Sequence, residues 1–422
     1  MDGKVETFKT RLVAKGYTQK EGIDYEETFF PMAMLKSIRI LLSIAASLDL
    51  EIWQMDVKTT FLNGSLDKSI YMMQPEGFIE KSQEERVCKL QKSIYGLKQA
   101  YRSWNIKFDQ AMKGFGFIQN LNEPCVYKRI KGDKLVFLIL YVDDILLIGN
   151  DIGVLTSVKE WLAKQFDMKD LGEASYIIGI QVIRDRKNRT ITLSQASYID
   201  KILFRFSMQD SKKGMSPFRH GIKLSKEQVR KNEHEEQFMS RIPYASVVGS
   251  LVYAMFYTRQ YICFVVGIVS RFQSKSGHDH WTAVKHIFKY LRRTRDYMLL
   301  YSGGDLIPIR YTDSDFQSNS DSRKSTSGSV FTIEGGAIIW RSIKQSCIAD
   351  SIIEAEYVAA CEAAKEAVWL RQFLVDLEVV PDANKQITIN CDNSGAVANL
   401  REPRSHKRGK HIEMKYHLLR EI

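Results

Sequence analysis

The feature that most restricts the fold of this chain is an apolar stretch at residues 135–149 with two adjacent aspartates inside it. The flanking runs, LVFLILYV and ILLIG, are rich in β-branched and large apolar residues and are separated only by Asp143 and Asp144. Two such runs joined by a two-residue break predict a β-hairpin. The fold must therefore bury two apolar strands while it keeps two negative charges at their junction.

Adjacent carboxylates at the end of apolar strands are costly unless a positive charge lies near them. An ordinary polar turn is the alternative, because aspartate is common in turns. Such turns usually add Gly or Asn, whereas the residues flanking this pair are Val142 and Ile145. Carboxylates that converge from rigid elements can hold two divalent cations about 3.5–4 Å apart. We therefore interpret Asp143 and Asp144 as candidate metal ligands.

A third carboxylate, Asp56, ends a strand predicted at residues 50–57, LEIWQMDV. A helix is predicted before that strand, at residues 35–48, because apolar residues recur there at helical spacing. Taken alone, Asp56 fits a capping or turn residue. At a strand end beside the hairpin it would complete a metal site.

The composition is that of a folded chain with more than one domain. Its 422 residues, 44% hydrophobic and 26% charged, predict two or three domains. A net charge of +11 suits a polyanionic partner, although a basic enzyme of another kind fits it equally well. The six scattered cysteines, without a CxxC pair, indicate reduced thiols in an intracellular compartment. No secretory signal is predicted, and charges within the apolar runs at 135–149 and 247–270 favour buried core over membrane spans.

Several long, ordered motifs resemble the reverse transcriptase of copia-type LTR retrotransposon Pol polyproteins. They include EIWQMDVKTTFLNG, KSIYGLKQAYRSWN and LYVDDILLIGND, and the similarity continues through DLGEASYIIGIQV and PYASVVGSLVYAM to the C-terminus. The resemblance implies an α/β fold: a right-hand polymerase with an α+β palm, followed by a ribonuclease H-like mixed sheet. Polar stretches at 207–243 and 302–305 mark domain boundaries. The predicted domains are fingers (N-terminally truncated) and palm at 1–206, a thumb or connection region at 207–304, and a ribonuclease H-like domain at 305–422.

The resemblance assigns polymerase roles residue by residue. It implies that Asp56, Asp143 and Asp144 bind Mg²⁺. Phe61 would pack under the incoming sugar, with plain core packing as the alternative, and Gly179 would belong to the primer-grip turn. The remaining nucleotide-binding residues implied by the resemblance are Lys9, Arg11, Val57, Gly96 and Lys98, although the segment with Lys9 and Arg11 fits a solvated basic face equally well.

A second set of acids lies beyond residue 306. In the strand IPIRYTD, Asp313 ends an alternating pattern. The helix predicted at 351–376 opens with Ser351 and Glu354 as a capping box, and Glu356 lies at the packed end of a stripe of small residues. Glu356 is either a buried metal ligand or a partly exposed acid at a helix end. Asp392, which follows the strand QITINC and precedes a helix beginning near Ser394, fits a helix cap if taken alone.

The pattern YTDSD…EAEYVA…CDNSGA resembles the ribonuclease H site of the same elements. It implies that Asp313, Glu356 and Asp392 are metal ligands, with Asp315 as a weaker competitor for the first role and Glu413 in the fourth position. In the basic run RSHKRGKH, we expect phosphate contacts from Lys407, Arg408 and Lys410 rather than a metal site at His406 and His411.

The function implied is an RNA-directed DNA polymerase with ribonuclease H activity, using two Mg²⁺ ions per active site, with Mn²⁺ as a substitute. Its partners would be an RNA template, a DNA primer, dNTPs and RNA–DNA hybrids, without a membrane, in the cytoplasm, a virus-like particle or the nucleus. The oligomeric state is left open. The alternative is an inactive, drifted nucleic-acid-binding remnant, favoured by the altered motifs TRQYI, SIIEAEY and FPMAM and by an expected lack of the upstream fingers strand.

Overall fold

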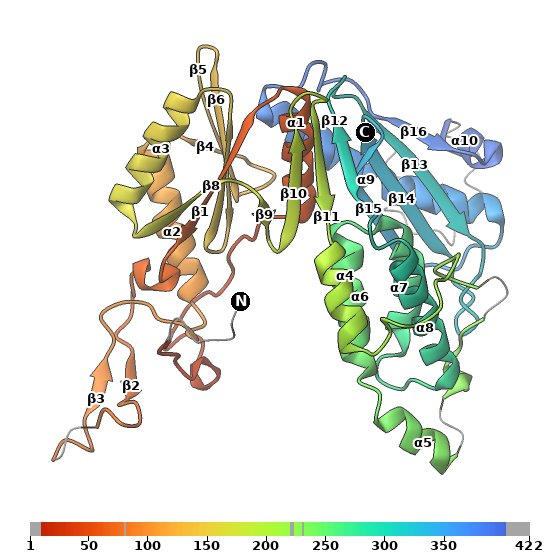
Figure 1. Cartoon of the computed structure of the whole chain (residues 1–422), viewed down its shortest axis with the longest axis horizontal. Helices are drawn as coiled ribbons and strands as arrows, with labels where there is room; N and C mark the ends of the chain where they lie inside the picture. The colour runs from red at the N-terminus through yellow and green to blue at the C-terminus, as the bar shows by residue number, and fades with distance from the viewer. Residues whose placement is uncertain (1–9, 80–81, 220–222, 230–231, 402–422) are drawn as a thin grey trace. The chain divides into compact units, whose positions relative to one another are not determined.

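The computed structural model describes residues 10–79, 82–219, 223–229 and 232–401. Contacts divide the chain into two compact units, and each is described by itself (Figure 1). The first unit comprises 1–34 and 51–174; the second comprises 35–50 and 175–422. Both combine helices with β-sheets, so the predicted mixed α/β class is confirmed.

The first unit is built on a six-stranded sheet in the order β4-β5-β6-β7-β1-β8. Every neighbouring pair in it is antiparallel. The strands are β1 (Glu51–Val57), β4 (Ile118–Gln119), β5 (Val126–Lys131), β6 (Lys134–Tyr141), β7 (Asp144–Gly149) and β8 (Met168–Glu173). A separate two-stranded sheet and two short 3₁₀ helices complete the unit: β2 (Tyr71–Met73), β3 (Val87–Lys89), η1 (Gly16–Thr18) and η2 (Thr60–Asn63).

Helices α2 (Ala100–Gly114) and α3 (Ile152–Gln165) share one core with this sheet (Figure 1). They bury large apolar side chains against the strands, among them Trp104, Phe108, Met112, Leu155, Val158 and Leu162. Their spacing of three and four residues places them on one helix face each. Strands β6 and β7 are buried along almost their whole length, which explains their continuous apolar sequence.

The predicted hairpin is confirmed, but its turn lies one residue earlier than expected. Tyr141 pairs with Asp144, so the turn residues are Val142 and Asp143, and Asp144 is the first residue of β7. Val142 takes a left-handed conformation with φ of 61°. A β-branched residue rarely adopts that conformation. The conformational preference of valine therefore gave no reason to predict a turn at Val142.

The second unit begins with α1 (Leu35–Ser47), as predicted, and contains a sheet in the order β12-β11-β10-β9. Its strands are β9 (Tyr176–Ile177), β10 (Ile180–Asp185), β11 (Thr190–Ser194) and β12 (Leu299–Ser302). A helical cluster with its own core follows β11. It consists of α4 (Ala196–Arg205), α5 (Glu233–Ser240), α6 (Tyr244–Tyr257), α7 (Cys263–Val269) and α8 (His278–Arg293), with 3₁₀ turns η3 (Lys226–Gln228), η4 (Gln260–Ile262) and η5 (Ser270–Phe272).

The C-terminal part of the second unit contains a sheet in the order β15-β14-β13-β16. Strands β13 (Pro308–Asp315), β14 (Thr326–Ile333) and β15 (Gly336–Lys344) are antiparallel, whereas β16 (Thr388–Cys391) runs parallel to β13. Helix α9 (Ile352–Leu377) packs on β13 and β14, and α10 (Ser394–Arg401) follows β16 (Figure 1). The predicted strand that carries Asp313 is confirmed, although it continues to Asp315, and the long helix and the helix from Ser394 are confirmed as well.

The contacts place α1 and strands β9 to β11 in the second unit, although all of them fall within the predicted domain 1–206. The division at 206 and 304 into three functional domains stays a prediction. The stretch 207–243 is not loop throughout, because α5 lies within it. Among the described residues, no helix combines the length and apolar character needed to cross a membrane.

Candidate active sites

The sheet of the first unit brings the three polymerase candidates together. Strand β1 lies beside β7, and their register sets Asp56 directly opposite Asp144. Asp143 lies in the turn, and its backbone oxygen accepts a hydrogen bond from the Val57 N–H at 2.9 Å. Directly opposed residues of an antiparallel pair have their Cβ atoms about 4.5–5.5 Å apart. The register therefore gathers carboxylates that are 87 and 88 positions apart in sequence (143 − 56 and 144 − 56).

The hairpin turn is fixed by a side chain from α2. The Trp104 indole Nε1–H donates a hydrogen bond to the Val142 carbonyl oxygen at 2.8 Å. Trp104 is buried and packs edge-on against Phe166. A rigid indole thus holds the residue that carries the left-handed conformation, and with it the aspartate that follows.

Asp144 has a polar partner that the sequence analysis did not single out. The Gln54 Nε2–H donates to Asp144 Oδ1 at 3.0 Å. Burial raises the pKa of the Asp144 carboxyl, and the nearby negative charges of Asp143 and Asp56 raise it further, whereas the Gln54 hydrogen bond acts in the opposite direction. Gln54 lies two residues before Asp56, and a period of two puts both on the same face of β1. That spacing was the signal that could have identified it.

Two nucleotide-binding candidates, Val57 and Phe61, follow Asp56 in the chain. Val57 is buried, and its N–H is the group bonded to Asp143. Phe61 is buried edge-on against Tyr95 and Tyr101, with ring centroids 4.8 and 4.4 Å away. Its ring is thus packed in an aromatic cluster, and the sugar-packing role stays a prediction.

The YGLK segment packs against the chain near residue 14. Gly96 has φ of +88°, and a Cβ there would lie 2.2 Å from the Ala14 carbonyl oxygen, so only glycine fits. The Lys98 ammonium donates to the Gln19 carbonyl and the Tyr25 hydroxyl at 3.3 and 3.1 Å. Arg11 lies over the Tyr95 ring, 5.6 Å from its centroid. Arg11 therefore lies on a segment anchored to the YGLK motif, which itself contains Lys98, and the contact of both residues with nucleotide stays a prediction.

Gly179, in the second unit, lies in a tight hairpin turn between β9 and β10. Ile178 and Gly179 both have positive φ, 52° and 76°, which is the geometry of a type I′ turn. The Tyr253 hydroxyl donates to the Ile178 carbonyl at 2.9 Å and supports the turn. The contact of Gly179 with a primer stays a prediction.

The second carboxylate set lies where β13 and β16 end. The pairing of these parallel strands stops at Thr312 and Cys391, so β13 continues beyond its neighbour. Glu356, from α9, reaches this open edge: its Oε1 accepts from the Ser314 N–H at 2.9 Å. The same N–H also donates to Asp313 Oδ1 at 2.8 Å. Parallel strands thus bring Asp313 and Asp392 to one edge, and the helix adds the third acid.

Glu356 has the most perturbed carboxyl of this set. Only 3% of its surface is exposed. Burial raises its pKa to about 7, and the charges of Asp313 and Asp392 and a hydrogen bond with Asp313 raise it as well. The Ser314 N–H lowers it only in part. Asp313 and Asp392 are exposed, so the three acids combine one buried and two accessible carboxylates.

Cys391 is a neighbour that the sequence analysis did not include. Its Sγ lies 4.0 Å from Glu356 Oε2, and ligand atoms of Glu356, Cys391 and Asp392 all lie within 4.8 Å of one another. Its position directly before Asp392 was the available signal. Asp315, the weaker competitor for the first role, instead accepts hydrogen bonds from the Thr326 N–H and the Ser318 hydroxyl.

Ser351 caps α9 through its hydroxyl, which accepts from the Glu354 N–H at 3.2 Å. The Glu354 carboxylate accepts from the Asp350 N–H rather than from Ser351, so the capping box is shifted by one residue. The remaining predicted residues lie outside the part of the chain that the structure describes: Lys9, His406, Lys407, Arg408, Lys410, His411 and Glu413.

Residues 1–220 match the family described as reverse transcriptase (RNA-dependent DNA polymerase). The chain therefore belongs to this family of nucleotidyltransferases. It is 46% identical over 422 residues to the retrovirus-related Pol polyprotein from transposon TNT 1-94 of Nicotiana tabacum, covering 100% of this chain and 32% of that protein. It is 34% identical over 420 residues to the corresponding polyprotein from transposon RE2 of Arabidopsis thaliana, covering 99% of this chain and 28% of that protein.

The polyprotein from transposon RE1 of Arabidopsis thaliana is 35% identical over 420 residues, with 28% of its length covered. The predicted resemblance to Pol polyproteins of copia-type retrotransposons is confirmed. The chain spans about a third of the length of these relatives, 32% or 28%.

Proposed function

We propose that this chain carries two catalytic centres, an RNA-directed DNA polymerase in the first unit and a ribonuclease H in the second. The observation that carries the first is the register of Asp56 against Asp144, with Asp143 in the adjoining turn. The six-stranded sheet would be the palm, residues near Ala14 and the YGLK motif would belong to the fingers, and residues 207–304 would form a thumb or connection region.

The carboxylates of the first centre suit a divalent cation. Hard oxygen ligands are those that Mg²⁺ prefers, with Mn²⁺ as a substitute. Burial and two neighbouring acids raise the pKa of Asp144 and so disfavour its charged form, and a cation bound there would offset this effect. When bound at Asp56, Asp143 and Asp144, two Mg²⁺ ions would stabilise charge on the attacking 3′-hydroxyl of the primer and on the pyrophosphate leaving group.

The chain's own residues would position the reactants. Gln54 holds the Asp144 carboxylate, and Trp104 holds the turn that carries Asp143. Arg11 and Lys98 would neutralise the triphosphate of a dNTP, while Gly96 lets the backbone segments approach closely. Phe61 would pack below the incoming sugar, and Gly179 would contact the primer strand of the RNA template–DNA primer duplex.

The second centre would hydrolyse the RNA strand of an RNA–DNA hybrid. Asp313, Glu356 and Asp392 would hold the cations, with Glu413 as a fourth acid. Burial and the neighbouring acids raise the pKa of Glu356 to about 7 and so disfavour its charged form. A cation bound there would again offset this effect. Bound Mg²⁺ would supply the activation of water. The basic residues Lys407, Arg408 and Lys410 would contact the phosphate backbone, through which such hybrids are read.

A primer-extension assay tests the first centre. The full chain is given a homopolymer RNA template, a DNA primer, dNTPs and Mg²⁺. We expect extension that Asp143→Asn abolishes. The matched control is Asp133→Asn, an exposed aspartate in the β5–β6 turn of the same sheet, which should leave extension unchanged. Equal signals from the chain and Asp143→Asn would reject the polymerase and favour the inactive remnant.

A hybrid-cleavage assay tests the second centre independently. Asp313→Asn should abolish cleavage of the RNA strand. The control, Asp382→Asn, changes an exposed aspartate whose ion-pair partner is Lys385 and should have no effect. Cleavage that persists in Asp313→Asn would mean that the activity arises elsewhere.

A further inference from the structure

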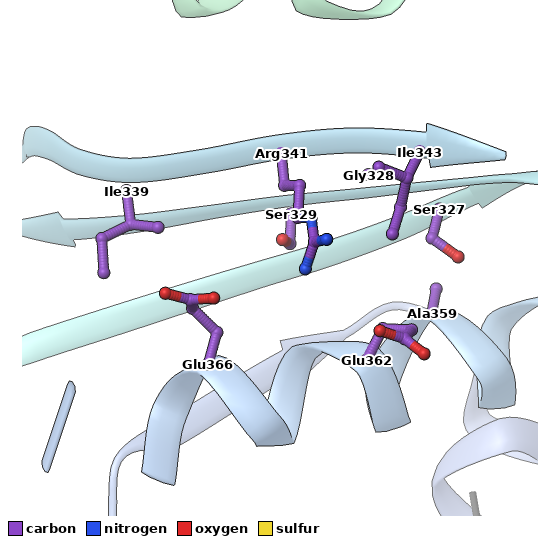
Figure 2. A pocket seen from close by; sticks show the side chains of 9 residues that line it. All are labelled: Ser327, Gly328, Ser329, Ile339, Arg341, Ile343, Ala359, Glu362 and Glu366. Carbon is purple, nitrogen blue, oxygen red and sulfur yellow. The ribbon is translucent and has the colours of Figure 1, made fainter. Parts of the chain in front are cut away.

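The two faces of the β13–β14–β15 sheet differ in what covers them. On one face, α9 closes over the strands and leaves a cavity of about 20 Å³, enough for about one water molecule. Figure 2 shows the Arg341 side chain on this face, directed toward Glu362 and Glu366 of α9. The opposite face carries Tyr311, Asp313 and Asp315, which alternate with the residues under α9.

This second face forms one wall of a groove of about 530 Å³. The other wall is formed by η4, through Gln260 and Tyr261, and by the start of α7, through Cys263 and Phe264. The floor of the groove is formed by residues that lie side by side on three neighbouring strands. Asp313 of β13 is opposite Gly328 of β14, which is opposite Ser342 of β15. Gly328 has no side chain, and a Cβ there would meet only the Asp313 carbonyl, at 3.6 Å. The groove is therefore hollow at the position next to a predicted metal ligand, and its volume lies in the range of roughly 300–1,000 Å³ typical of ligand sites.

Aromatic rings line the groove and remain accessible. Tyr311 is 51% exposed on the sheet wall, and Phe264 is 37% exposed on the α7 wall. Trp340, below them, is buried and uses its Nε1–H to bond the Met255 carbonyl at 3.1 Å. Accessible rings beside a polar floor are what nucleic-acid bases stack on, because every base has a π-face.

Positive side chains gather at the Asp315 end of the groove. Thr326 of β14 lies between Asp315 of β13 and Lys344 of β15, its partners on the two neighbouring strands. The Arg271 guanidinium donates to the Thr326 hydroxyl at 3.3 Å. Burial lowers the pKa of Lys344, and the charges of Arg271 and Lys324 lower it further, whereas Asp321 acts in the opposite direction. A concentration of cations that repel one another attracts a phosphate backbone. Aromatic walls and a basic end together match a nucleotide chain and argue against an apolar peptide.

We propose that this groove binds an unpaired nucleotide segment that extends from the hybrid held at the second carboxylate set. A base stacks between Tyr311 and Phe264, and the adjoining phosphates contact Arg271, Lys324 and Lys344. The groove would thus give the second centre a preference for hybrids with a single-stranded extension over blunt hybrids. This inference rests on the proposed ribonuclease H function.

Fluorescence anisotropy with labelled nucleic acids tests the proposal. All proteins carry Asp392→Asn, a residue outside the groove, so that hybrids stay intact in Mg²⁺. The probes are a blunt RNA–DNA hybrid, the same hybrid with a four-nucleotide unpaired extension on either strand, the same extensions with abasic residues, and the free oligonucleotide. We expect a base-bearing extension to lower Kd about tenfold relative to the blunt hybrid, since stacking on an aromatic ring is worth about that factor per base. The abasic extension should give little of this gain.

Phe264→Ala and Tyr311→Ala should each remove most of the gain and leave the Kd of the blunt hybrid unchanged. Phe238→Ala, on α5, is the matched control, because that ring is 41% exposed and lies outside the groove. Gly328→Val fills the floor without removing an aromatic ring and should have the same effect as Phe264→Ala. Lys344→Gln should weaken binding of hybrids with base-bearing and with abasic extensions, because both contain phosphates. The salt dependence of that binding should become less steep.

The outcomes separate the two proposals. Blunt-hybrid binding without any gain from a base-bearing extension would overturn the groove and leave the ribonuclease H function standing. A gain that persists in Phe264→Ala, Tyr311→Ala and Gly328→Val would also overturn it. Binding of the free oligonucleotide that depends on these residues, without binding of the blunt hybrid, would support the groove and count against hybrid recognition. No binding of any probe would reject both.

Discussion

The two carboxylate sets are assembled in opposite ways. In the first, Asp56 and Asp144 face each other across one antiparallel strand pair, and Asp143 is the neighbour of one of them. In the second, Asp313 and Asp392 come directly after the last paired residues of two parallel strands, and Glu356 comes from a helix packed on the sheet. Strand register therefore fixes the first set, whereas helix packing completes the second.

The two sets also differ in how deeply their acids are buried and in the groups that hydrogen-bond them. Asp144 is half-buried and is held by a neutral amide from its own sheet. Glu356 is almost fully buried and is held by a backbone N–H across an open strand edge. We conclude that the first set depends on single hydrogen bonds near the turn, while the second depends on the burial of one acid.

The largest expected effect concerns the independence of the two sets. Asp144→Asn should reduce primer extension by at least about 10³-fold, because the charge that would hold the cation is lost. Hybrid cleavage by the same variant should stay within twofold (roughly 0.4 kcal/mol) of the unaltered chain. Asp392→Asn should show the reverse pattern. Steady-state rates of both reactions on all three proteins check this, and loss of both activities in either variant would break the comparison.

Gln54→Leu should reduce primer extension about 10- to 100-fold and raise the Mg²⁺ concentration needed for half-maximal rate. The amide orients a proposed metal ligand, and loss of such an orienting group typically costs that factor in activity or metal affinity. Gln119→Leu, which removes a glutamine hydrogen bond to Pro124 in the same sheet, is the control. A Mg²⁺ titration of the extension rate is the measurement. A reduced rate with an unchanged Mg²⁺ requirement would contradict an orienting role.

The sequence was most informative where the site follows strand register. The apolar runs on either side of Asp143 and Asp144 predicted the hairpin, and the run at 50–57 predicted the strand that carries Asp56. The turn position was wrong because a bond from Trp104, 38 residues earlier in the chain, stabilises a conformation that Val142 alone disfavours. Such a contact leaves no local signal.

Helical packing left fewer signals. The stripe of small residues correctly predicted which face of α9 packs, and so the burial of Glu356. Cys391 was not identified, because nothing in its spacing shows that α9 brings Glu356 beside it. Helix α5 was overlooked in a polar stretch, although Asn232 caps it and acids fill its first turn. Such residues mark where a helix begins, and they do not contribute to the apolar spacing from which helices were predicted.

The burial of Glu356 gives a pH dependence that sharpens the contrast. Its folded pKa of about 7 lies above the ordinary value of 4.5, so between these pH values the native state holds a proton that the unfolded state has lost. The free energy of unfolding of the metal-free chain should therefore fall as pH rises from about 4.5 to 7. The loss should be at most about 3.5 kcal/mol, since one pKa unit corresponds to about 1.4 kcal/mol.

Urea denaturation in EDTA, followed by circular dichroism, measures this dependence. The free energy of unfolding of the chain, minus that of Glu356→Gln, should decrease as pH rises. Only the unaltered chain has a buried carboxyl at this position that must give up its proton. Above pH 7, Mg²⁺ should stabilise the chain more than the variant, because the ion favours the charged carboxylate. A pH-independent difference would mean that burial of Glu356 is not what distinguishes the second set.

The smallest expected effect tests whether the turn is held by one hydrogen bond. Trp104→Phe keeps an aromatic ring in the core but leaves the Val142 carbonyl without its donor, which should lower the free energy of unfolding by about 1–3 kcal/mol. Primer extension should fall several-fold, because Asp143 then follows a less constrained residue. Trp161→Phe alters a ring on α3 that stacks on Phe115 in the same core and should cost stability without affecting extension. If the two variants lose stability and extension in equal proportion, general core packing rather than the bond to the turn positions Asp143, and the first set then depends on packing as much as the second.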